Sequence, residues 1–382
     1  MELGPDRHAW QAELATRRRP MRSDADDRLV LLGTSGGSLP KATRCGYANA
    51  IVVGDAAYII DAGEGMHRQM WRAGITANAR FGATRPLVRG VVLTHLHADH
   101  LFDLPNLFQG SWPTTPIDLY GPGPAGPPYT THDDPIHPVR FAESPAPGVR
   151  EVLDHFHRAF AVNINARIVG EHRSDYLDRV RVHEIGLVGE VDGSDDVDDI
   201  AGDIAIDAVV ERDGPVFEVP DIEPFVVRPE DEHGVTITAT LVQHAPIFPA
   251  LAYRFDTPSG SVVFSGDTGP CDNVVRLATD ADILVHEVFD LDHWARTMPT
   301  QSPDRDHVLA QLARSHTSVD EVGVIAERAG VGILVLSHLV PSDGGHTTEE
   351  WEAMVQPAFP SGKVICGVDL DELPIGGGST HG

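Results

Sequence analysis

Four potential metal ligands follow a short apolar run within residues 91–100, which read VVLTHLHADH. These ligands are His95, His97, Asp99 and His100. Imidazole and carboxylate groups together suit a divalent ion, first Zn2+, with Mn2+ and Fe2+ as alternatives. One tetrahedral ion cannot easily use all four groups from so short a loop. The spacing therefore predicts two ions side by side.

The residues before these ligands predict a strand that ends at the ligand loop. Residues 91–93 are apolar, two of them are β-branched, and Gly90 opposes a helix across the segment. Side chains alternate along an extended chain, so His95 and His97 can point the same way where the strand ends. Asp99 and His100 would then lie on the turn beyond the strand.

Polar side chains also end several strands that the pattern predicts in the second half of the chain. They are His244 after residues 235–242, Asp267 after 261–264, His286 and Glu287 after 282–285, and His338 after 333–336. Proteins of the α/β class commonly place their chemistry at such strand ends. A helix is predicted from the capping box at Ser318 and Glu321 to Arg328.

In these motifs the chain resembles the metallo-β-lactamase superfamily, whose dinuclear members carry His-x-His-x-Asp-His after a strand. Further motifs come in the superfamily's order: residues 31–37 (LLGTSGG), 59–65 (IIDAGEG), 264–268 (FSGDT) and 334–338 (LVLSH). The match covers about residues 29–142 and 234–370. The resemblance implies an α/β fold, a four-layer αβ/βα sandwich of the metallo-β-lactamase type, here with an inserted cap segment.

The resemblance also implies a seven-ligand centre and hydrolysis. Its ligands would be His95, His97 and His244 for one ion, Asp99, His100 and His338 for the other, and Asp267 as the bridge. Water bound to zinc has a pKa of about 7, so a metal-bridging hydroxide would be available as the nucleophile near neutral pH. His155 and His157 form a rival pair, but residues two apart on a helix point about 200° apart, which favours cap or substrate contacts.

The closest branch in motif content is ribonuclease Z, a group of zinc phosphodiesterases. The matching segments are residues 61–65 with Gln69, 104–105, 120–122, 266–270, 286–287 and 316–318. In that branch a glutamate and a histidine at these places protonate the leaving oxygen, which assigns Glu287 and His316 to this catalytic role. Asp99 is also expected to be catalytic, in addition to its role as a metal ligand. Glu64 is expected to hold loop amides or a ligand imidazole.

Two departures from this branch concern transfer RNA processing. The branch carries a basic Gly- and Pro-rich arm, whereas residues 186–213 hold ten acidic side chains against Arg212 alone, a net charge of −9. The branch also follows its last histidine with a serine and an Arg-Tyr pair, while residues 339–343 read LVPSD. An arylsulfatase, carboxylic ester hydrolase or lactonase is therefore the alternative to a 3'-tRNA-processing endoribonuclease. A noncatalytic RNA-processing subunit is the second alternative.

The charge of the chain bears on its partners. With 29 basic and 57 acidic residues, the net charge of −28 disfavours RNA and favours a small ester or phosphodiester substrate. Cap residues Phe156 and Phe160, with His155 and His157, would give such a substrate a partly apolar pocket. The three cysteines have no pattern that predicts a disulfide framework.

Composition also predicts how the chain is organised. Residues 1–27 form a polar tail, 28–372 a single hydrolase domain with an insertion or cap at about 143–233, and 373–382 a Gly-rich tail. No apolar run is long enough to cross a bilayer, and the first residues do not form a secretion signal. We therefore expect a cytoplasmic protein without a membrane partner, with a homodimer as an option.

Overall fold

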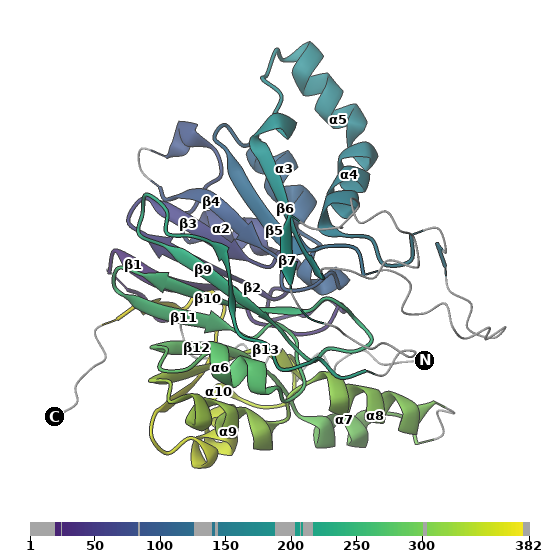
Figure 1. Ribbon diagram of the computed structural model, residues 1–382, viewed down its shortest axis with the longest axis vertical. Helices are drawn as coiled ribbons and strands as arrows, with labels where there is room; N and C mark the ends of the chain where they lie inside the picture. Colours follow the sequence, from purple (N-terminus) through teal and green to yellow (C-terminus); the bar gives the residue numbers. More distant parts are fainter. Residues whose placement is uncertain are drawn as a thin grey trace.

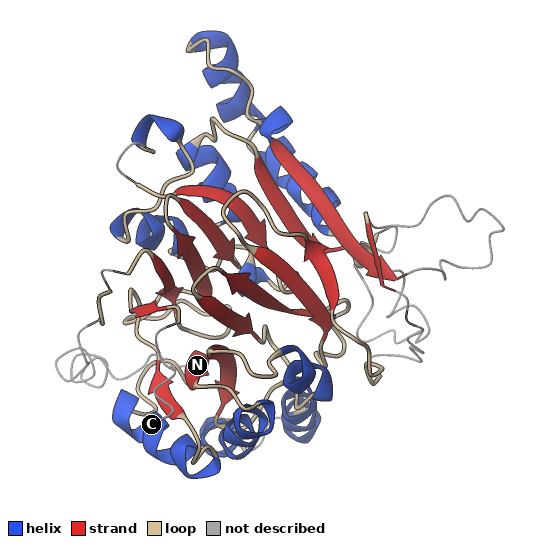
Figure 2. Cartoon of the chain, turned by 60° about the vertical axis from the view of Figure 1, so that its left-hand side comes forward, coloured by secondary structure: helices blue, strands red, loops and turns tan. Residues whose placement is uncertain are grey.

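Two β-sheets lie face to face in the middle of the molecule, and helices cover the outer face of each (Figure 2). The computed structural model describes residues 20–23, 25–82, 85–125, 140–141, 144–187, 203–206, 208, 217–300 and 304–376. Most of the acidic segment 186–213 and of the tail at 1–27, and the last residues of the Gly-rich tail, lie outside these ranges. The arrangement of layers confirms the four-layer αβ/βα sandwich.

The first sheet has eight strands in the order β15-β1-β2-β3-β4-β5-β6-β7. Their bounds are β1 (Asp27–Gly33), β2 (Ala48–Val53), β3 (Ala56–Ile60), β4 (Leu87–Val92), β5 (Ile117–Pro122), β6 (Val180–Leu187), β7 (Ile204–Ile206) and β15 (Glu372–Pro374). From β3 to β7 neighbouring strands are parallel, so their carboxyl ends share one edge of the sheet.

The second sheet has seven strands in the order β14-β13-β12-β11-β10-β9-β8. Their bounds are β8 (Phe225–Arg228), β9 (Thr236–Leu241), β10 (Leu251–Thr257), β11 (Gly260–Phe264), β12 (Ile283–Phe289), β13 (Ile333–Val340) and β14 (Lys363–Cys366). Strand β9 is antiparallel to β10, and β10 to β11, while β11 to β14 are parallel. The carboxyl ends of β9, β11, β12 and β13 therefore meet at one edge.

The helices form the two outer layers (Figure 1). On the first sheet lie α2 (Met66–Arg72), α3 (Leu104–Ser111), α4 (Val149–Ala159) and α5 (Ala161–Asn165). On the second sheet lie α6 (Asp272–Leu277), α7 (Leu291–Thr297), α8 (Arg305–Ser315), α9 (Val319–Ala329) and α10 (Thr348–Val355). Strand alternation sends Leu29 and Leu31 between the sheets and Val30 and Leu32 toward the helices. Each sheet thus buries both faces.

Most predicted elements are present, and two strands are longer than predicted. The capping box of Ser318 and Glu321 opens α9, as expected. Strand β12 continues to Phe289 and β13 to Val340, so the prediction that His286, Glu287 and His338 follow their strands was wrong. The apolar residues after these polar side chains keep both strands paired beyond them.

The region expected to form a cap contributes to both sheets as well as to the helices. Strands β6 and β7 extend the first sheet, and β8 forms an edge of the second. The helical part of this region consists of α4, α5 and a π-helical turn at Ala166–Gly170. The domain boundaries themselves stay a prediction.

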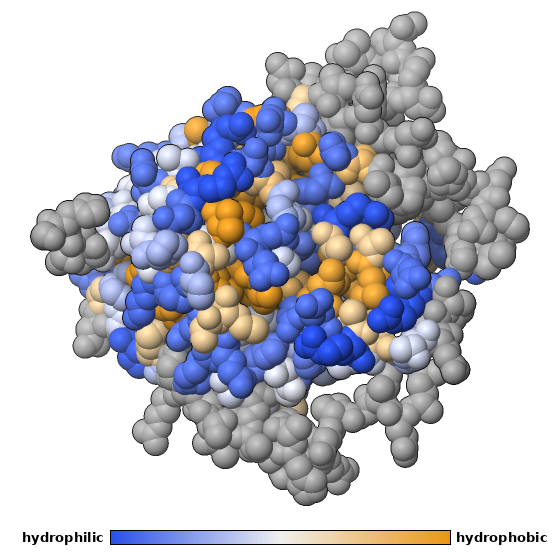
Figure 3. Space-filling view, turned by 90° about the horizontal axis from the view of Figure 1, so that it is seen from below, coloured by the Kyte–Doolittle hydropathy of each residue, from blue (hydrophilic) through white to orange (hydrophobic). Residues whose placement is uncertain are grey.

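The outer surface of the second helical layer is mostly hydrophilic, with separate apolar patches (Figure 3). Exposed apolar side chains of this layer include Val324 on α9 and Met354 on α10. No helix in the described part of the chain combines the length and apolar character needed to span a membrane.

Candidate metal centre

The edges of the two sheets are joined where the polar strand ends meet. The amide of Leu251 at the start of β10 donates to Thr94 O at 2.9 Å, and the Tyr253 hydroxyl donates to Leu93 O at 3.1 Å. Both acceptors lie between the end of β4 and residues 95–100, which we call the histidine loop and which is the ligand loop predicted above. These bonds hold the ligand loop of the first sheet against the strand ends of the second.

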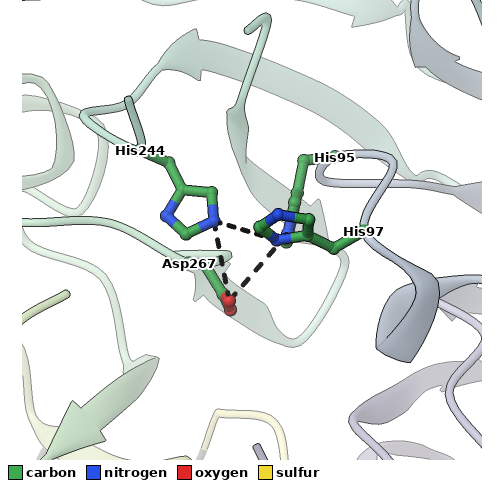
Figure 4. Close-up of side chains that lie close together, drawn as sticks. All are labelled: His95, His97, His244 and Asp267. Carbon is green, nitrogen blue, oxygen red and sulfur yellow. Dashed lines mark hydrogen bonds and ion pairs between the residues drawn. The ribbon is translucent and has the colours of Figure 1, made fainter. Parts of the chain in front are cut away.

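The first group of predicted ligands converges as expected. The facing atoms of His95, His97, His244 and Asp267 lie within 4.8 Å of one another (Figure 4). His97 Nδ1 lies 2.9 Å from His95 Nε2 and 3.2 Å from His244 Nε2. Asp267 Oδ2 is 3.9 Å from the Nε2 atoms of both His95 and His244.

The second group shares Asp267 with the first. Asp99, His100, His338 and Asp267 also place one ligand atom each within 4.8 Å of one another, and all four are buried. Asp267 Oδ1 lies 3.3 Å from His100 Nε2 and 3.2 Å from His338 Nε2. The two oxygens of one carboxylate thus face two different sets of side chains.

A β-bulge places His338 in this group. Glu287 pairs with Ser337 and Val288 with Leu339, so His338 is the extra residue on β13, and its φ is 47°. Bulges are common beside active sites, where they turn a side chain out of the regular alternation. Here the bulge directs the His338 imidazole toward Asp99 and Asp267.

Hydrogen bonds at the far side of the rings determine which nitrogen faces the centre. His100 Nδ1 donates to Asp61 Oδ2 at 2.9 Å, and His244 Nδ1 donates to Ser315 O at 2.8 Å. With the proton on Nδ1, the Nε2 atom of His244 presents a lone pair toward Asp267. Burial opposes protonation of His100, but Asp267 and Asp61 outweigh it and raise its pKa, so an ion bound at this position would replace the proton on its Nε2. Asp61 is itself fixed by the amide and hydroxyl of Thr94.

The donor set fits divalent ions. Burial lowers the pKa of His95 and His97, and it lowers that of His244 to about 3, so these imidazoles are neutral and offer lone pairs. His100 Nε2 and Asp267 Oδ1 are buried 3.3 Å from each other, and neither has a hydrogen-bond partner of good geometry among the described residues. One proton on His97 Nδ1 cannot satisfy both neighbouring Nε2 atoms, whereas a cation between them can.

The Asp99 carboxylate is held by the loop that follows β1. Gly37 N donates to Asp99 Oδ2 at 3.0 Å, and the Ser38 hydroxyl donates to Asp99 Oδ1 at 3.2 Å. Burial opposes ionisation of Asp99, but the bond from His338 and the nearby His100 outweigh it and lower its pKa. The side chain is therefore anionic at neutral pH.

Glu287 and His316 form a hydrogen-bonded pair beside the first group. His316 Nδ1 lies 2.9 Å from Glu287 Oε1 and 3.0 Å from Oε2, and the ring stacks on Phe289. Burial opposes protonation of His316, but the Glu287 carboxylate outweighs it and raises the pKa of the imidazole to about 9. His316 thus carries a proton at neutral pH, and its ring centroid is 5.2 Å from that of His244.

Other predictions for individual residues have different outcomes. His155 is exposed on α4, and His157 packs against Phe108 and Tyr176, so neither joins the ligand groups found among the described residues. Glu64 was expected to hold loop amides or a ligand imidazole, but its side chain is exposed, and it is Asp61 that binds the His100 imidazole. A carboxylate directly after the buried strand β3 was the sequence signal for Asp61.

The apolar pocket predicted from the cap helix is lined by other residues. A cavity of about 170 Å3 lies between the segments 145–147 and 246–249, with Leu96 and Val152 in its wall. Phe156 and Phe160 do not line it, and Phe160 is 40% exposed. Leu96 lies between two ligands of the first group, so the cavity adjoins the histidine loop.

Comparison with known proteins agrees with this arrangement. A family model described as Beta-lactamase superfamily domain matches residues 198–339. Ribonuclease Z of Mycobacterium bovis (strain BCG / Pasteur 1173P2) is 30% identical over 355 residues, which covers 91% of this chain and 98% of that protein. Ribonuclease Z of Mycobacterium tuberculosis (strain H37Rv) is 29% identical, covering 91% and 97%.

The fold comparison points the same way. The crystal structure of the short form of human tRNase Z superposes with a TM-score of 0.51 at 18% identity, covering 91% of this chain and 99% of that chain. Sequence similarity over nearly the whole length and the shared fold together place the protein. The chain belongs to the ribonuclease Z family of metallo-β-lactamase-fold proteins and is a metal-dependent hydrolase.

Proposed function

We propose that the seven clustered residues bind two divalent ions, with zinc as the first candidate, and that the protein hydrolyses phosphodiesters. His95, His97 and His244 would hold one ion, and Asp99, His100 and His338 the other. Asp267 would bridge them. The observation that carries this proposal is the division of the two Asp267 oxygens between two separate sets of ligand atoms.

The residues around the centre have separable tasks in such a reaction. Two ions held there would supply an activated water and positive charge for the developing oxyanion. Asp61 and Ser315 hold the protons of His100 and His244 on the outer ring nitrogens, which keeps the inner lone pairs available. His316, protonated and oriented by Glu287, can donate its proton to the leaving oxygen.

The proposed reaction leaves two classes of substrate to compare, a transfer RNA and a small phosphodiester. The names of the relatives make a precursor transfer RNA the first macromolecule to test. The net charge of −28 opposes binding of a long polyanion, and the apolar cavity beside Leu96 favours a small phosphodiester with an uncharged group. We propose a small phosphodiester as the preferred substrate. A cytoplasmic location and a homodimer stay predictions.

A side-by-side rate comparison tests this proposal. The metal-loaded protein is assayed on a bis-aryl phosphate, an aryl sulfate, a lactone and a precursor transfer RNA, with Asp267→Ala as the inactive reference. We expect the highest kcat/KM on the bis-aryl phosphate and loss of that activity in the variant. A phosphodiester activity that survives in Asp267→Ala, or none in the wild type, would contradict the proposal.

The same cavity supports a small ester as the second candidate substrate. An apolar acyl or aryl group could occupy the space between Leu96 and residues 246–249, next to the first ligand group. Ile247→Arg would place a charge in that space. The second candidate replaces the first under two conditions. The wild type must hydrolyse the aryl sulfate or the lactone faster than the phosphodiester, and Ile247→Arg must lower kcat/KM for that substrate.

A further inference from the structure

A third cluster of metal-ligating side chains lies outside the seven-residue centre. Within the described ranges three groups converge closely enough to hold an ion, and two of them share Asp267. The third consists of Asp290, His293 and His346, whose ligand atoms lie within 4.8 Å of one another. Asp290 directly follows β12, His293 lies in the first turn of α7, and His346 precedes the N-cap of α10.

The backbone and neighbouring side chains fix these groups from several sides. Asp290 N donates to Val340 O at 2.8 Å, and Asp290 Oδ1 accepts from His293 N at 2.8 Å. His346 Nε2 lies 2.7 Å from Asp290 Oδ2, and its ring meets the Trp351 ring edge-on at 5.0 Å. The cluster thus joins the turn between β12 and α7 to the distant segment that precedes α10.

Helix capping alone does not account for the third member. Asp290 as N-cap and His346 as its partner explain two side chains, but the His293 ring also turns to this point, 5.6 Å from the His346 ring. Burial lowers the pKa of His293, so its imidazole is neutral. Burial opposes ionisation of Asp290, but the His293 amide and His346 outweigh it and lower its pKa.

We propose that Asp290, His293 and His346 bind one further divalent cation of the zinc type. Two imidazoles and a carboxylate are a zinc ligand set that leaves the fourth position for water or an anionic oxygen. The cluster is only partly buried, so an ion has access to it. This site does not require the two ions of the proposed catalytic centre.

The charge around the cluster favours a cation. Asp290 also lines a cavity of about 440 Å3, whose wall includes His316 and Ser318. Four carboxylates line this cavity, from Asp290, Asp292, Asp320 and Glu321, against the protonated His316 as the one cationic side chain of its described lining. Arg296 also acts on His293, but the carboxylates outnumber these two cations. A bound cation would offset this negative charge at the edge of the cavity.

Metal titration of the full-length, tag-free chain tests the proposal. The protein is stripped with a chelator, and bound Zn2+ is counted by equilibrium dialysis and metal analysis. We expect three equivalents for the wild type and two for His293→Ala and for His346→Ala. The matched control is His183→Ala, because His183 also pairs with a buried aspartate, Asp118, on the first sheet. It should keep three equivalents.

A second background separates this site from the proposed catalytic centre. In Asp267→Ala, which lacks the bridging carboxylate, adding His346→Ala should remove one further equivalent. Circular dichroism of each variant checks the fold. A wild-type stoichiometry that is unchanged in both His293→Ala and His346→Ala would overturn the proposal. If only the catalytic centre is assigned wrongly, Asp267→Ala binds as much metal as the wild type, while the His346→Ala loss remains.

Discussion

Asp61 Oδ2 accepts a hydrogen bond from His100 Nδ1 at 2.9 Å, and both side chains are fully buried. The same carboxylate accepts bonds from the amide and hydroxyl of Thr94, at 2.7 and 2.8 Å. Asp61 therefore connects the end of β3 to the start of the histidine loop. Its carboxylate thereby orients the His100 imidazole by binding the ring nitrogen that faces away from Asp267.

This relationship predicts that Asp61→Asn weakens metal binding. The amide oxygen can still accept a hydrogen bond, but the charge that makes the His100 imidazole more basic is lost. We expect metal affinity to fall about 10- to 100-fold, measured by competition with a chromophoric chelator. Asp118→Asn is the control, since Asp118 is also buried but binds Arg181 and His183. Equal affinities in the two variants would argue against this role of Asp61.

The bridging position of Asp267 predicts that both ions depend on it. Asp267→Ala removes the oxygens that face both ligand sets, so metal content should drop and kcat/KM should fall about 100-fold or more. Metal analysis and phosphodiester kinetics on the same preparation measure the two effects. Full activity in this variant would remove the basis for the proposed centre.

The Glu287–His316 pair predicts a dependence on the leaving group. If His316 donates the proton, His316→Ala should lower kcat/KM by about 10²- to 10⁴-fold for phosphodiesters with poor alkoxide leaving groups. Aryl phosphodiesters need little protonation of the leaving oxygen and should lose far less. A plot of rate against leaving-group pKa, for the wild type and the variant, measures the difference. Equal slopes in the wild type and in His316→Ala would show that His316 does not donate the proton to the leaving oxygen.

The same pair predicts a pH effect of defined sign. Glu287 raises the pKa of His316 to about 9, so His316 is protonated below that pH and its acid function is lost as the pH rises through it. Glu287→Gln removes the negative charge and should lower this pKa. The alkaline limb of kcat/KM should therefore move to lower pH in the variant. An unchanged limb would mean that another group causes it.

The crowded surroundings of Gly266 predict that Gly266→Ala destabilises the fold more than Gly54→Ala does. The φ of Gly266 is 61°, and an added Cβ would lie 2.8 Å from Leu251 O and 2.9 Å from Thr94 Cβ. Gly54 has a φ of 53° but no atom within 4 Å of such a Cβ. Gly54→Ala should lower the free energy of unfolding by about 1 kcal/mol through φ alone. Gly266→Ala should lower it by about 1–3 kcal/mol more, measured by urea denaturation.

Similar losses in both glycine variants would mean that the contact around Gly266 relaxes at little cost. The site readout adds to this test, because Gly266 precedes Asp267 directly. A shifted Asp267 should reduce metal affinity in Gly266→Ala and leave it unchanged in Gly54→Ala.

The motifs in the sequence, through their resemblance to the metallo-β-lactamase superfamily, were enough to predict the layered fold and the set of side chains that converge. Apolar runs with alternating or continuous burial marked the strands, and the motif at residues 95–100 with His244, Asp267 and His338 named the side chains that converge. The strand pattern is local, since the order of residues along a strand fixes which neighbours can face the same side, whereas the set of converging residues came from the resemblance. Glu287 and His316 were assigned from the resemblance to ribonuclease Z, and their side chains are hydrogen-bonded to each other.

Only the tertiary structure decided how these side chains are aimed. Asp61 holds His100 because β3 and the histidine loop are neighbours in the sheet, and His338 reaches the site through a bulge set by pairing with β12. The cluster of Asp290, His293 and His346 joins residues 56 positions apart. Such contacts depend on backbone angles and on strand register, which arise from long-range packing and leave no periodic trace in the sequence.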